Sequence, residues 1–221
     1  MFRDEGALDP ALFKPLEEAL QARPLEVNKY RKQSGLGRSQ CFGIVLQRNG
    51  HYHGSRQNAH RMDLYKLLLT LIQQIDPLLD YDGIQLNQNY QTQPHKDKNN
   101  RGESLIIGFG DYEGGDLLVE EQAVSIKHRK VFFCGSLYTH ATAPWTGNRY
   151  SIVFFKVDRE FAIKPSYQIV QVGNKEVLVE DIGGVVSIYN KRGECIHRNL
   201  GLEIRPRRQR QPTLSACVEI E

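Results

Sequence analysis

A series of short β-rich runs between residues 83 and 157 is the feature that most constrains how this chain can fold. Turn-forming loops such as YEGG and WTGN join the runs, which are GIQLNQNY, SLIIGFG, GDLLVEE, AVSIKHR, KVFFCG, LYTHATA and RYSIVFFKV. Short strands separated by turn residues are typical of antiparallel sandwiches and jelly rolls. We therefore expect an α+β protein with a jelly-roll (double-stranded β-helix) core and flanking N-terminal helices.

The residues ahead of this β region predict two helices and a strand. The stretch ALFKPLEEALQAR follows Asp9-Pro10, which predicts a capped helix with proline in its first turn. Residues 55–79 place apolar side chains at three- and four-residue spacing, the period of a helix face that packs on a sheet. The run CFGIVLQ, from Cys41 to Gln47, predicts a strand.

Length and composition fit one globular domain. The chain has 221 residues, of which 40% are apolar and 25% charged, and this excludes disordered, collagen-like and disulfide-scaffold proteins. We expect residues 1–82 to support the core and residues 83–158 to form it. Residues 159–221 would add the strand-like runs YQIVQV, KEVLVED and VVSIYN and a basic tail.

The sequence predicts an intracellular protein and no membrane partner. The longest apolar stretch, Leu67 to Ile72, is interrupted by Thr70 and is far shorter than the roughly 20 residues that a bilayer needs. The start, MFRDEGALDP, lacks the apolar segment of a signal peptide. Four cysteines lie far apart without a C-x-x-C pair: Cys41, Cys134, Cys195 and Cys217. We expect a monomer in a reducing compartment, nucleus or cytoplasm, that is not secreted.

Positive charge is concentrated in two places rather than spread along the chain. The net charge of +3 is too small to indicate a nucleic-acid partner by itself. The two basic clusters are Lys29, Arg31, Lys32 and Arg38, and then Arg205, Arg207, Arg208 and Arg210. Each is either a solvated surface or a set of phosphate contacts, and the sequence leaves both interpretations open.

An H-x-D pair and a distant histidine predict a metal site. His95 and Asp97 follow the strand that ends at Tyr90, and His140 comes 43 residues after Asp97. Alternate residues of an extended segment share a face, so His95 and Asp97 point the same way. A jelly roll can bring a later strand with His140 beside them. Two imidazoles and one carboxylate form the facial triad of mononuclear non-haem Fe(II), which leaves coordination positions open.

A second pair of residues predicts an anchor for a dicarboxylic acid. Arg149 and Ser151 are two positions apart in a strand and therefore share its face. Arginine offers a planar fork suited to a carboxylate, and serine offers a hydroxyl beside it. A dicarboxylic 2-oxo acid would chelate the metal at one end and bind Arg149 at the other.

Together these motifs resemble the Fe(II)/2-oxoglutarate dioxygenase superfamily over roughly residues 83–157. The pattern is H-x-D, a distal histidine and then Arg-x-Ser nine residues later, with a tight Gly114–Leu117 hairpin (GGDL) between two strands. The resemblance implies an enzyme that uses Fe(II), 2-oxoglutarate as cosubstrate and O2, and that releases succinate and CO2. It implies His95, Asp97 and His140 as catalytic metal ligands and Arg149 and Ser151 at the cosubstrate.

Within the superfamily, PHKDKNNRGESLIIGFGDYEGGDLLVEE looks most like TET/JBP-type oxygenases, which oxidise the methyl group of 5-methylpyrimidines in nucleic acid. The pair Asn99-Asn100 is similar to the polar loop that faces the substrate base there. This resemblance implies DNA as the substrate and 5-methylcytosine as the oxidised base. GGDL and THATAPWTGNRYS also resemble prolyl-hydroxylase-type enzymes, so a protein hydroxylase is the alternative. A non-catalytic jelly-roll binding module is the third hypothesis, and the intact triad and arginine argue against it.

Several polar and aromatic residues have both a functional and a structural interpretation. Tyr90 is a candidate cosubstrate ligand or a core tyrosine, and Asn87 and Asn89 either line the substrate cleft or are strand-edge residues. Trp145 covers the cosubstrate, stacks on a base or packs in the core. His51, His53 and His60 are expected to be solvated loop residues, with a second metal site as the alternative.

Overall fold

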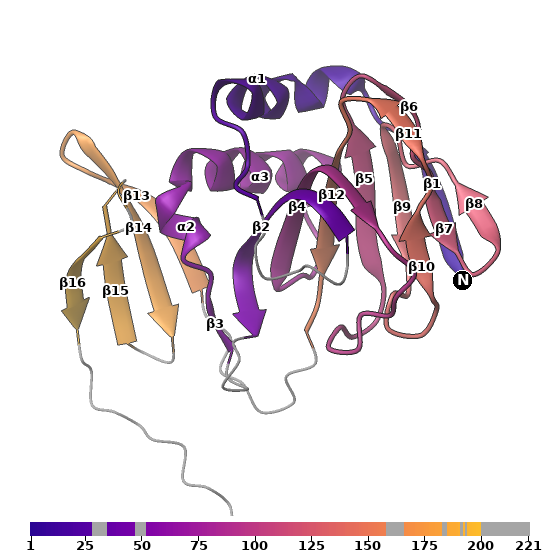
Figure 1. Ribbon diagram of the computed structural model, residues 1–221. Coiled ribbons are helices and arrows are strands. Elements are labelled where there is room, and N and C mark those ends of the chain that lie inside the picture. Colours follow the sequence, from indigo (N-terminus) through magenta and orange to yellow (C-terminus); the bar gives the residue numbers. More distant parts are fainter. Residues whose placement is uncertain are drawn as a thin grey trace, which may run out of the picture.

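A seven-stranded antiparallel sheet forms the centre of the protein (Figure 1). The computed structural model describes residues 1–27, 35–46, 52–157, 166–182, 185–190, 192 and 194–199. The sheet has the order β1-β9-β5-β12-β4-β2-β3. Its strands are β1 (Phe2–Ala7), β2 (Gly35–Leu46), β3 (Tyr52–Gly54), β4 (Gly83–Thr92), β5 (Ser104–Phe109), β9 (Arg129–Phe133) and β12 (Tyr150–Phe155).

Two small sheets cover part of one face of the large sheet and complete the jelly roll. They have the orders β10-β7-β8 and β11-β6 and consist of β6 (Tyr112–Gly114), β7 (Leu117–Val119), β8 (Gln122–Val124), β10 (His140–Thr142) and β11 (Trp145–Gly147). All six residues of β5 are buried, so both of its faces are covered. Ile106 packs with Leu117 and Val119 of the small sheet, whereas Leu105 and Ile107 belong to the helix side. The expected jelly-roll fold is confirmed.

Helices cover the opposite face of the large sheet (Figure 1). They are a 3-10 turn, η1 (Pro10–Phe13), and α1 (Lys14–Ala22), α2 (Gln57–His60) and α3 (Met62–Ile75). The Asp9 side chain accepts a hydrogen bond from Ala11 N and so begins the first of them. Leu16, Leu20 and Leu68 are buried in one apolar cluster with the sheet, as the helical spacing predicts.

The single helix expected over residues 55–79 is wrong, because the chain breaks at Arg61. Arg61 has φ −126° and ψ 47°, outside the helical region, between α2 and α3. Its side chain is 1% exposed and donates to the Arg23 carbonyl at 3.1 Å. The break therefore directs the Arg61 guanidinium to the Arg23 carbonyl at the end of α1. A continuous helix would not place the side chain there. A periodicity count finds the apolar face and overlooks this tertiary contact.

The segment before residue 83 contributes strands as well as helices to the core. β1 was not expected, because its residues are mostly exposed and polar. It pairs with β9 at the sheet edge, where Arg129 donates two hydrogen bonds to the Asp4 carboxylate at 2.6 and 2.9 Å. The expected strand at Cys41–Gln47 begins earlier, as β2, which pairs with β4 from Gly35 to Gly43 and with β3 over its last residues. The division into residues 1–82, 83–158 and 159–221 stays a prediction.

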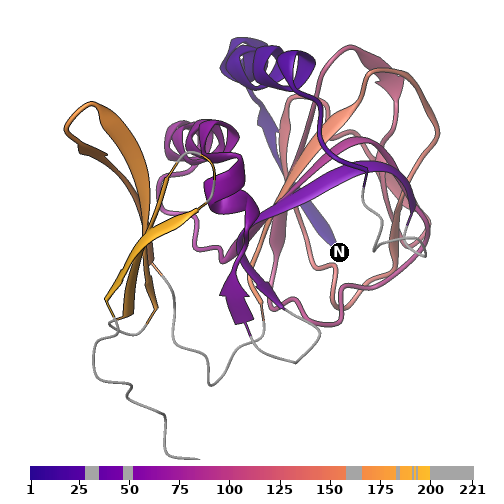
Figure 2. The same ribbon diagram turned by 60° about the vertical axis from the view of Figure 1, so that its left-hand side comes forward.

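A four-stranded antiparallel sheet follows the jelly roll and lies beside α2 and α3 (Figure 2). Its strands are β13 (Ser166–Val172), β14 (Lys175–Ile182), β15 (Val185–Tyr189) and β16 (Cys195–Asn199). Leu178 is 1% exposed and joins the apolar cluster of α3, and Lys66 of α3 forms an ion pair with Glu176. The basic cluster at Arg205–Arg210 lies outside the described residues.

The structure describes three of the four cysteines. Cys41, Cys134 and Cys195 are free thiols. Cys217 and the basic residues Lys29, Arg31 and Lys32 lie outside the described part of the chain. No helix in the described ranges has the length and apolar character needed to cross a bilayer.

The Asn58 side chain connects the short helix α2 to the sheet through hydrogen bonds, and truncation of this side chain should destabilise the fold. The side chain is 1% exposed, accepts from Gly43 N at 2.7 Å and donates to Gly43 O at 3.1 Å. Asn58→Ala leaves both backbone groups without this partner, so we expect the free energy of unfolding to fall by about 2–4 kcal/mol. Chemical denaturation measures the change. The control Gln73→Ala, at an exposed position of α3, should alter it by less than about 0.5 kcal/mol.

Candidate metal and cosubstrate site

Main-chain hydrogen bonds bring the H-x-D segment and the distal histidine together. His95 N donates to His140 O at 3.1 Å, and His140 N donates to His95 O at 3.0 Å. Asp97 N donates to Gly135 O at 2.9 Å, in the loop that leads to β10. The loop after β4 is therefore joined to β10 of the small sheet, and the three side chains point into the space between the sheets.

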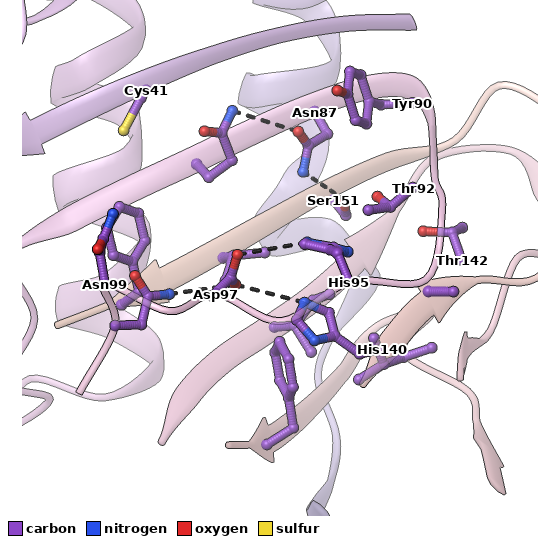
Figure 3. Close-up of a pocket in the computed structure, with 18 of the residues that line it drawn as sticks. Cys41, Asn87, Tyr90, Thr92, His95, Asp97, Asn99, His140, Thr142 and Ser151 are labelled. Carbon is purple, nitrogen blue, oxygen red and sulfur yellow. Dashed lines mark hydrogen bonds and ion pairs between the residues drawn. The ribbon is translucent and has the colours of Figure 1, made fainter. Parts of the chain in front are cut away.

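The donor atoms of His95, Asp97 and His140 form one compact cluster. One donor atom from each residue lies within 4.8 Å of the others. His95 Nε2 is 3.5 Å from Asp97 Oδ1, and His140 Nε2 is 3.5 Å from Asp97 Oδ2. Figure 3 shows the carboxylate on one side of the two rings, with a dashed line to each of them. Within the described ranges, no other group of histidine, cysteine and carboxylate side chains has this arrangement.

Hydrogen bonds to the far side of each ring fix which nitrogen faces the cluster. His95 Nδ1 lies 2.8 Å from Gln93 O, and His140 Nδ1 lies 3.2 Å from Tyr138 O. A carbonyl oxygen can only accept, so Nδ1 carries the proton in both rings. The Nε2 lone pairs therefore face Asp97, as metal-binding imidazoles require.

The electrostatics of the cluster demand a cation. Burial by itself would raise the pKa of the Asp97 carboxyl, but with both rings protonated the hydrogen bonds and positive charge of His140 and His95 outweigh burial and hold the pKa well below its ordinary range. With neutral rings, two lone pairs would face a carboxylate, and only a shared proton or metal ion makes the contacts attractive. Two imidazoles and one carboxylate, with open positions toward a pocket, fit Fe(II).

A pocket of about 280 Å³ extends from this cluster in both directions between the sheets. Figure 3 shows Cys41 and Asn99 on one side of the cluster and Tyr90, Thr92 and Thr142 on the other. The lining includes most of the candidate residues, namely Asn87, Tyr90, His95, Asp97, Asn99, Asn100, His140, Arg149 and Ser151.

Arg149 is a buried cation in this pocket without an acidic partner. Its side chain is 2% exposed, and burial lowers the pKa of its guanidinium. Nε donates to Gly115 O at 3.0 Å, and the guanidinium lies over the rings of Trp145 and Tyr112, at 5.5 and 5.7 Å from their centroids. It forms no ion pair with any carboxylate that the structure describes. An anionic ligand would supply the missing counter-charge.

The double glycine makes room for this arginine. A Cβ at Gly115 would lie 2.7 Å from Arg149 Cδ and Nε, and both Gly114 and Gly115 have positive φ, 76° and 69°. The expected GGDL hairpin is wrong, because β6 pairs with β11 and β7 pairs with β8 and β10 rather than with each other. The two glycines connect β6 of one small sheet to β7 of the other, and the Gly115 carbonyl accepts a hydrogen bond from the Arg149 side chain.

Ser151 is the last member of a polar chain across β4 and β12. Asn87 Nδ2 donates to Ser151 Oγ at 3.2 Å, and Gln85 Nε2 lies 3.4 Å from Asn87 Oδ1 (Figure 3). Because the serine oxygen accepts from Asn87, its own proton is directed elsewhere in the pocket. The structure therefore places Asn87 beside the predicted cosubstrate anchor rather than beside a substrate.

Some candidate residues are not in the pocket. Asn89 has φ 47° and accepts from Arg149 N at 2.8 Å, so its side chain supports the backbone of Arg149 instead of lining the cleft. His60 is exposed, with Nδ1 3.2 Å from Arg192 O, and is not part of a metal cluster. His51 and the side chain of His53 lie outside what the structure describes.

Three pocket residues, Cys41, Gln85 and Phe155, were missed in the sequence. Phe155 lies opposite Gly83, where a Cβ would be 2.4 Å from the phenylalanine Cζ, so the ring lies against the glycine. The sequence contains a signal for Phe155, because alternate residues of a strand share a face and Ser151 is predicted to lie in the site. The same face of β12 continues through Val153 to Phe155.

Comparisons with known proteins establish the fold. No protein-family model matches the sequence, and no curated protein matches it. The structure is similar to that of NgTET1 in complex with 5mC DNA, with a TM-score of 0.50, 19% identity, and coverage of 68% of this chain and 69% of that one. A Pseudomonas putida prolyl-4-hydroxylase gives a TM-score of 0.44, 19% identity and coverage of 71% and 92%. A 2OG-Fe(II) oxygenase family protein from Burkholderia pseudomallei gives a TM-score of 0.46, 17% identity, and coverage of 70% of this chain and 82% of that one. The likeness to NgTET1 shows that the two chains share a fold, the jelly roll described above.

Removal of His140 should abolish metal binding. We expect Mn(II), an air-stable substitute for Fe(II), to raise the unfolding midpoint of the wild-type protein by roughly 5–10 °C at about 100 times its Kd. His140→Ala removes one of three ligands and should eliminate the rise. His60→Ala, outside the cluster, is the control and should keep it. A rise of unchanged size in the His140 variant would contradict the assignment.

Proposed function

We propose that this protein is an Fe(II)/2-oxoglutarate-dependent oxygenase. The observation that carries the proposal is that one pocket holds both a His-Asp-His cluster and a buried arginine without a carboxylate partner. Each feature is unfavourable alone: the cluster needs a cation, and Arg149 needs an anion. A metal ion and a dicarboxylate that bridges from the metal to Arg149 satisfy both.

The residues of the chain have distinct tasks in this proposal. His95, Asp97 and His140 hold the metal and leave positions open for ligands. Arg149 and Ser151 bind the distal carboxylate of 2-oxoglutarate, and Tyr90 closes that end of the pocket. When bound, iron with 2-oxoglutarate and O2 supplies the oxidising chemistry, with succinate and CO2 as co-products. The remaining task of the protein is to hold the substrate C–H near the metal and exclude water.

The other end of the pocket supports a planar, uncharged substrate group. Six residues of extended strand separate Arg149 from Phe155, which corresponds to roughly 20 Å. Phe155 is half-buried and lines the pocket together with the amide of Asn99 and the small side chains of Cys41 and Val157. An aromatic face beside amide groups suits a nucleobase, which stacks on the ring and forms hydrogen bonds at its edge.

We therefore propose nucleic acid as the substrate and the methyl group of 5-methylcytosine as the position oxidised. The likeness to NgTET1, whose structure contains 5mC DNA, supports this choice of substrate. Methyl oxidation within a duplex requires the base to leave its stack, because the reacting carbon must come close to the metal.

The arginine fork is the basis of a prediction about the cosubstrate. Arg149→Lys keeps the charge but loses the two-pronged geometry, so we expect the Kd for 2-oxoglutarate to rise by about 10- to 100-fold. Anaerobic calorimetry of the Mn(II)-loaded protein measures it. The matched control is Arg129→Lys on β9, whose arginine pairs with Asp4, and it should leave the Kd unchanged. A normal Kd in the Arg149 variant would remove this residue from the anchor.

The substrate proposal is tested by product mass. Iron-loaded protein with 2-oxoglutarate should convert 5-methylcytosine in an oligonucleotide to 5-hydroxymethylcytosine, seen as one added oxygen on the nucleoside. Phe155→Leu removes stacking worth about 1–3 kcal/mol per base and should lower the conversion about tenfold or more. Methylated DNA and RNA that both stay unmodified, while a peptide library gains an oxygen, would instead establish the protein-hydroxylase alternative.

A further inference from the structure

The loop between β4 and β5, residues 93–103, carries an unusual charge arrangement. It supplies His95, Asp97, Asn99 and Asn100 to the pocket. Between and after these residues stand three cations, all exposed: Lys96, Lys98 and Arg101. The same short loop therefore holds the metal ligands and presents positive charge to solvent around them.

Backbone contacts place this loop at the substrate end of the pocket. Asn100 forms a β-bridge with Val157, and Arg101 N donates to Lys156 O at 2.9 Å. The loop thus runs beside the end of β12, next to Phe155 and far along the strand from Arg149. Lys98 directly precedes Asn99, which Figure 3 shows on the Cys41 side of the metal cluster.

The positive charge of the loop is not neutralised by nearby acids. Asp97 belongs to the metal cluster, Glu103 pairs with Arg3 at 3.1 Å, and the neighbouring Lys156 pairs with Asp80. Lys98 and Arg101 form no ion pair among the residues that the structure covers.

Lys96 differs from the other two cations of the loop. Its Nζ donates to Leu137 O at 2.7 Å, which ties the loop to the segment before β10. Two exposed cations, Lys98 and Arg101, therefore remain at the substrate end without an anionic partner in the described structure.

We propose that Lys98 and Arg101 bind the backbone phosphates that flank the nucleotide whose base enters the pocket. This proposal rests on the proposed function and specifies the surface that the nucleic acid contacts. A base that enters the pocket brings its flanking phosphates to the pocket mouth, because the base is covalently bonded to the sugar-phosphate backbone. Phosphate contacts fix the position of the strand without reading its sequence. The Asp and Glu side chains of an acidic peptide would match the two cations, but they offer no planar ring for Phe155.

Salt-dependent binding tests this role. The full chain is titrated into a labelled oligonucleotide containing 5-methylcytosine at several salt concentrations. Each lost phosphate contact should reduce the slope of log K against log salt by about 0.7 for a single strand or 0.9 for a duplex. The Lys98→Ser, Arg101→Ser double variant should therefore lose about 1.4–1.8 in slope and bind about tenfold or more weakly at ~0.15 M salt.

The control has the same change of charge elsewhere. Lys14 on α1 and Lys175 beside the β13–β14 turn are exposed, and neither lines the pocket. The Lys14→Ser, Lys175→Ser variant should keep the wild-type slope and an affinity within about twofold. Unfolding midpoints of both variants should match the wild type, which separates lost contacts from lost folding. Equal slopes for the two double variants would overturn the proposal.

Two further measurements separate this proposal from the proposed function. Succinate release by the wild-type protein reports oxygenase chemistry independently of any oligonucleotide. If succinate forms and the oligonucleotide binds, but the loop variant binds like the control, only the phosphate role fails. If no succinate forms and 2-oxoglutarate does not bind, the proposed function fails. Binding of a glutamate-rich peptide in place of the oligonucleotide would also overturn the assignment to phosphate.

Discussion

The reciprocal main-chain hydrogen bonds between His95 and His140 are the contact on which the functional site depends. They join a loop of the large sheet to a strand of the small sheet across 45 positions of sequence. Without them the two imidazoles would belong to separate layers, and Asp97 would have no cluster to complete. Because the backbone makes this contact, ring orientation needs only one more constraint, which the Nδ1 contacts to Gln93 and Tyr138 supply.

The buried Arg149 is an unfavourable group in the folded protein, and the proposed cosubstrate would stabilise it. Removing a guanidinium from water without a carboxylate partner destabilises the folded protein. The structure offsets part of this with the Gly115 carbonyl, two aromatic faces and a backbone bond to Asn89. In the proposed function, the distal carboxylate of the cosubstrate would supply the missing counter-charge. A purely structural arginine would be expected to resemble Arg61, which donates to the Arg23 carbonyl and to Gln40.

Much of the site could be predicted because its residues come in pairs that are two positions apart in the sequence. The features that sequence analysis missed depend on tertiary contacts. The H-x-D pair and Arg-x-Ser each follow from the two-residue period of extended chain, and the jelly roll followed from regularly spaced turns. The edge strand β1 is polar, and its pairing with β9 is distant in sequence. The break at Arg61 is likewise a response to α1 and β2, which no helical periodicity encodes. Asn89 alternates correctly with Asn87, but its positive φ turns it out of the pocket.

One face of β12 carries residues of both the proposed cosubstrate anchor and the proposed substrate platform. Along β12, Ser151, Val153 and Phe155 all line the pocket, so the strand fixes the separation between the cosubstrate anchor and the substrate platform. The loop after β4 contributes His95 and Asp97 to the pocket between these two ends, and its Asn100 is bridged to Val157 just after β12. Asn100 also donates to Asp97 Oδ2 at 3.3 Å, so the loop residue that is bridged to Val157 also contacts the His-Asp-His cluster. The same short loop therefore holds Asp97 of the His-Asp-His cluster and contacts the end of the strand that carries Phe155.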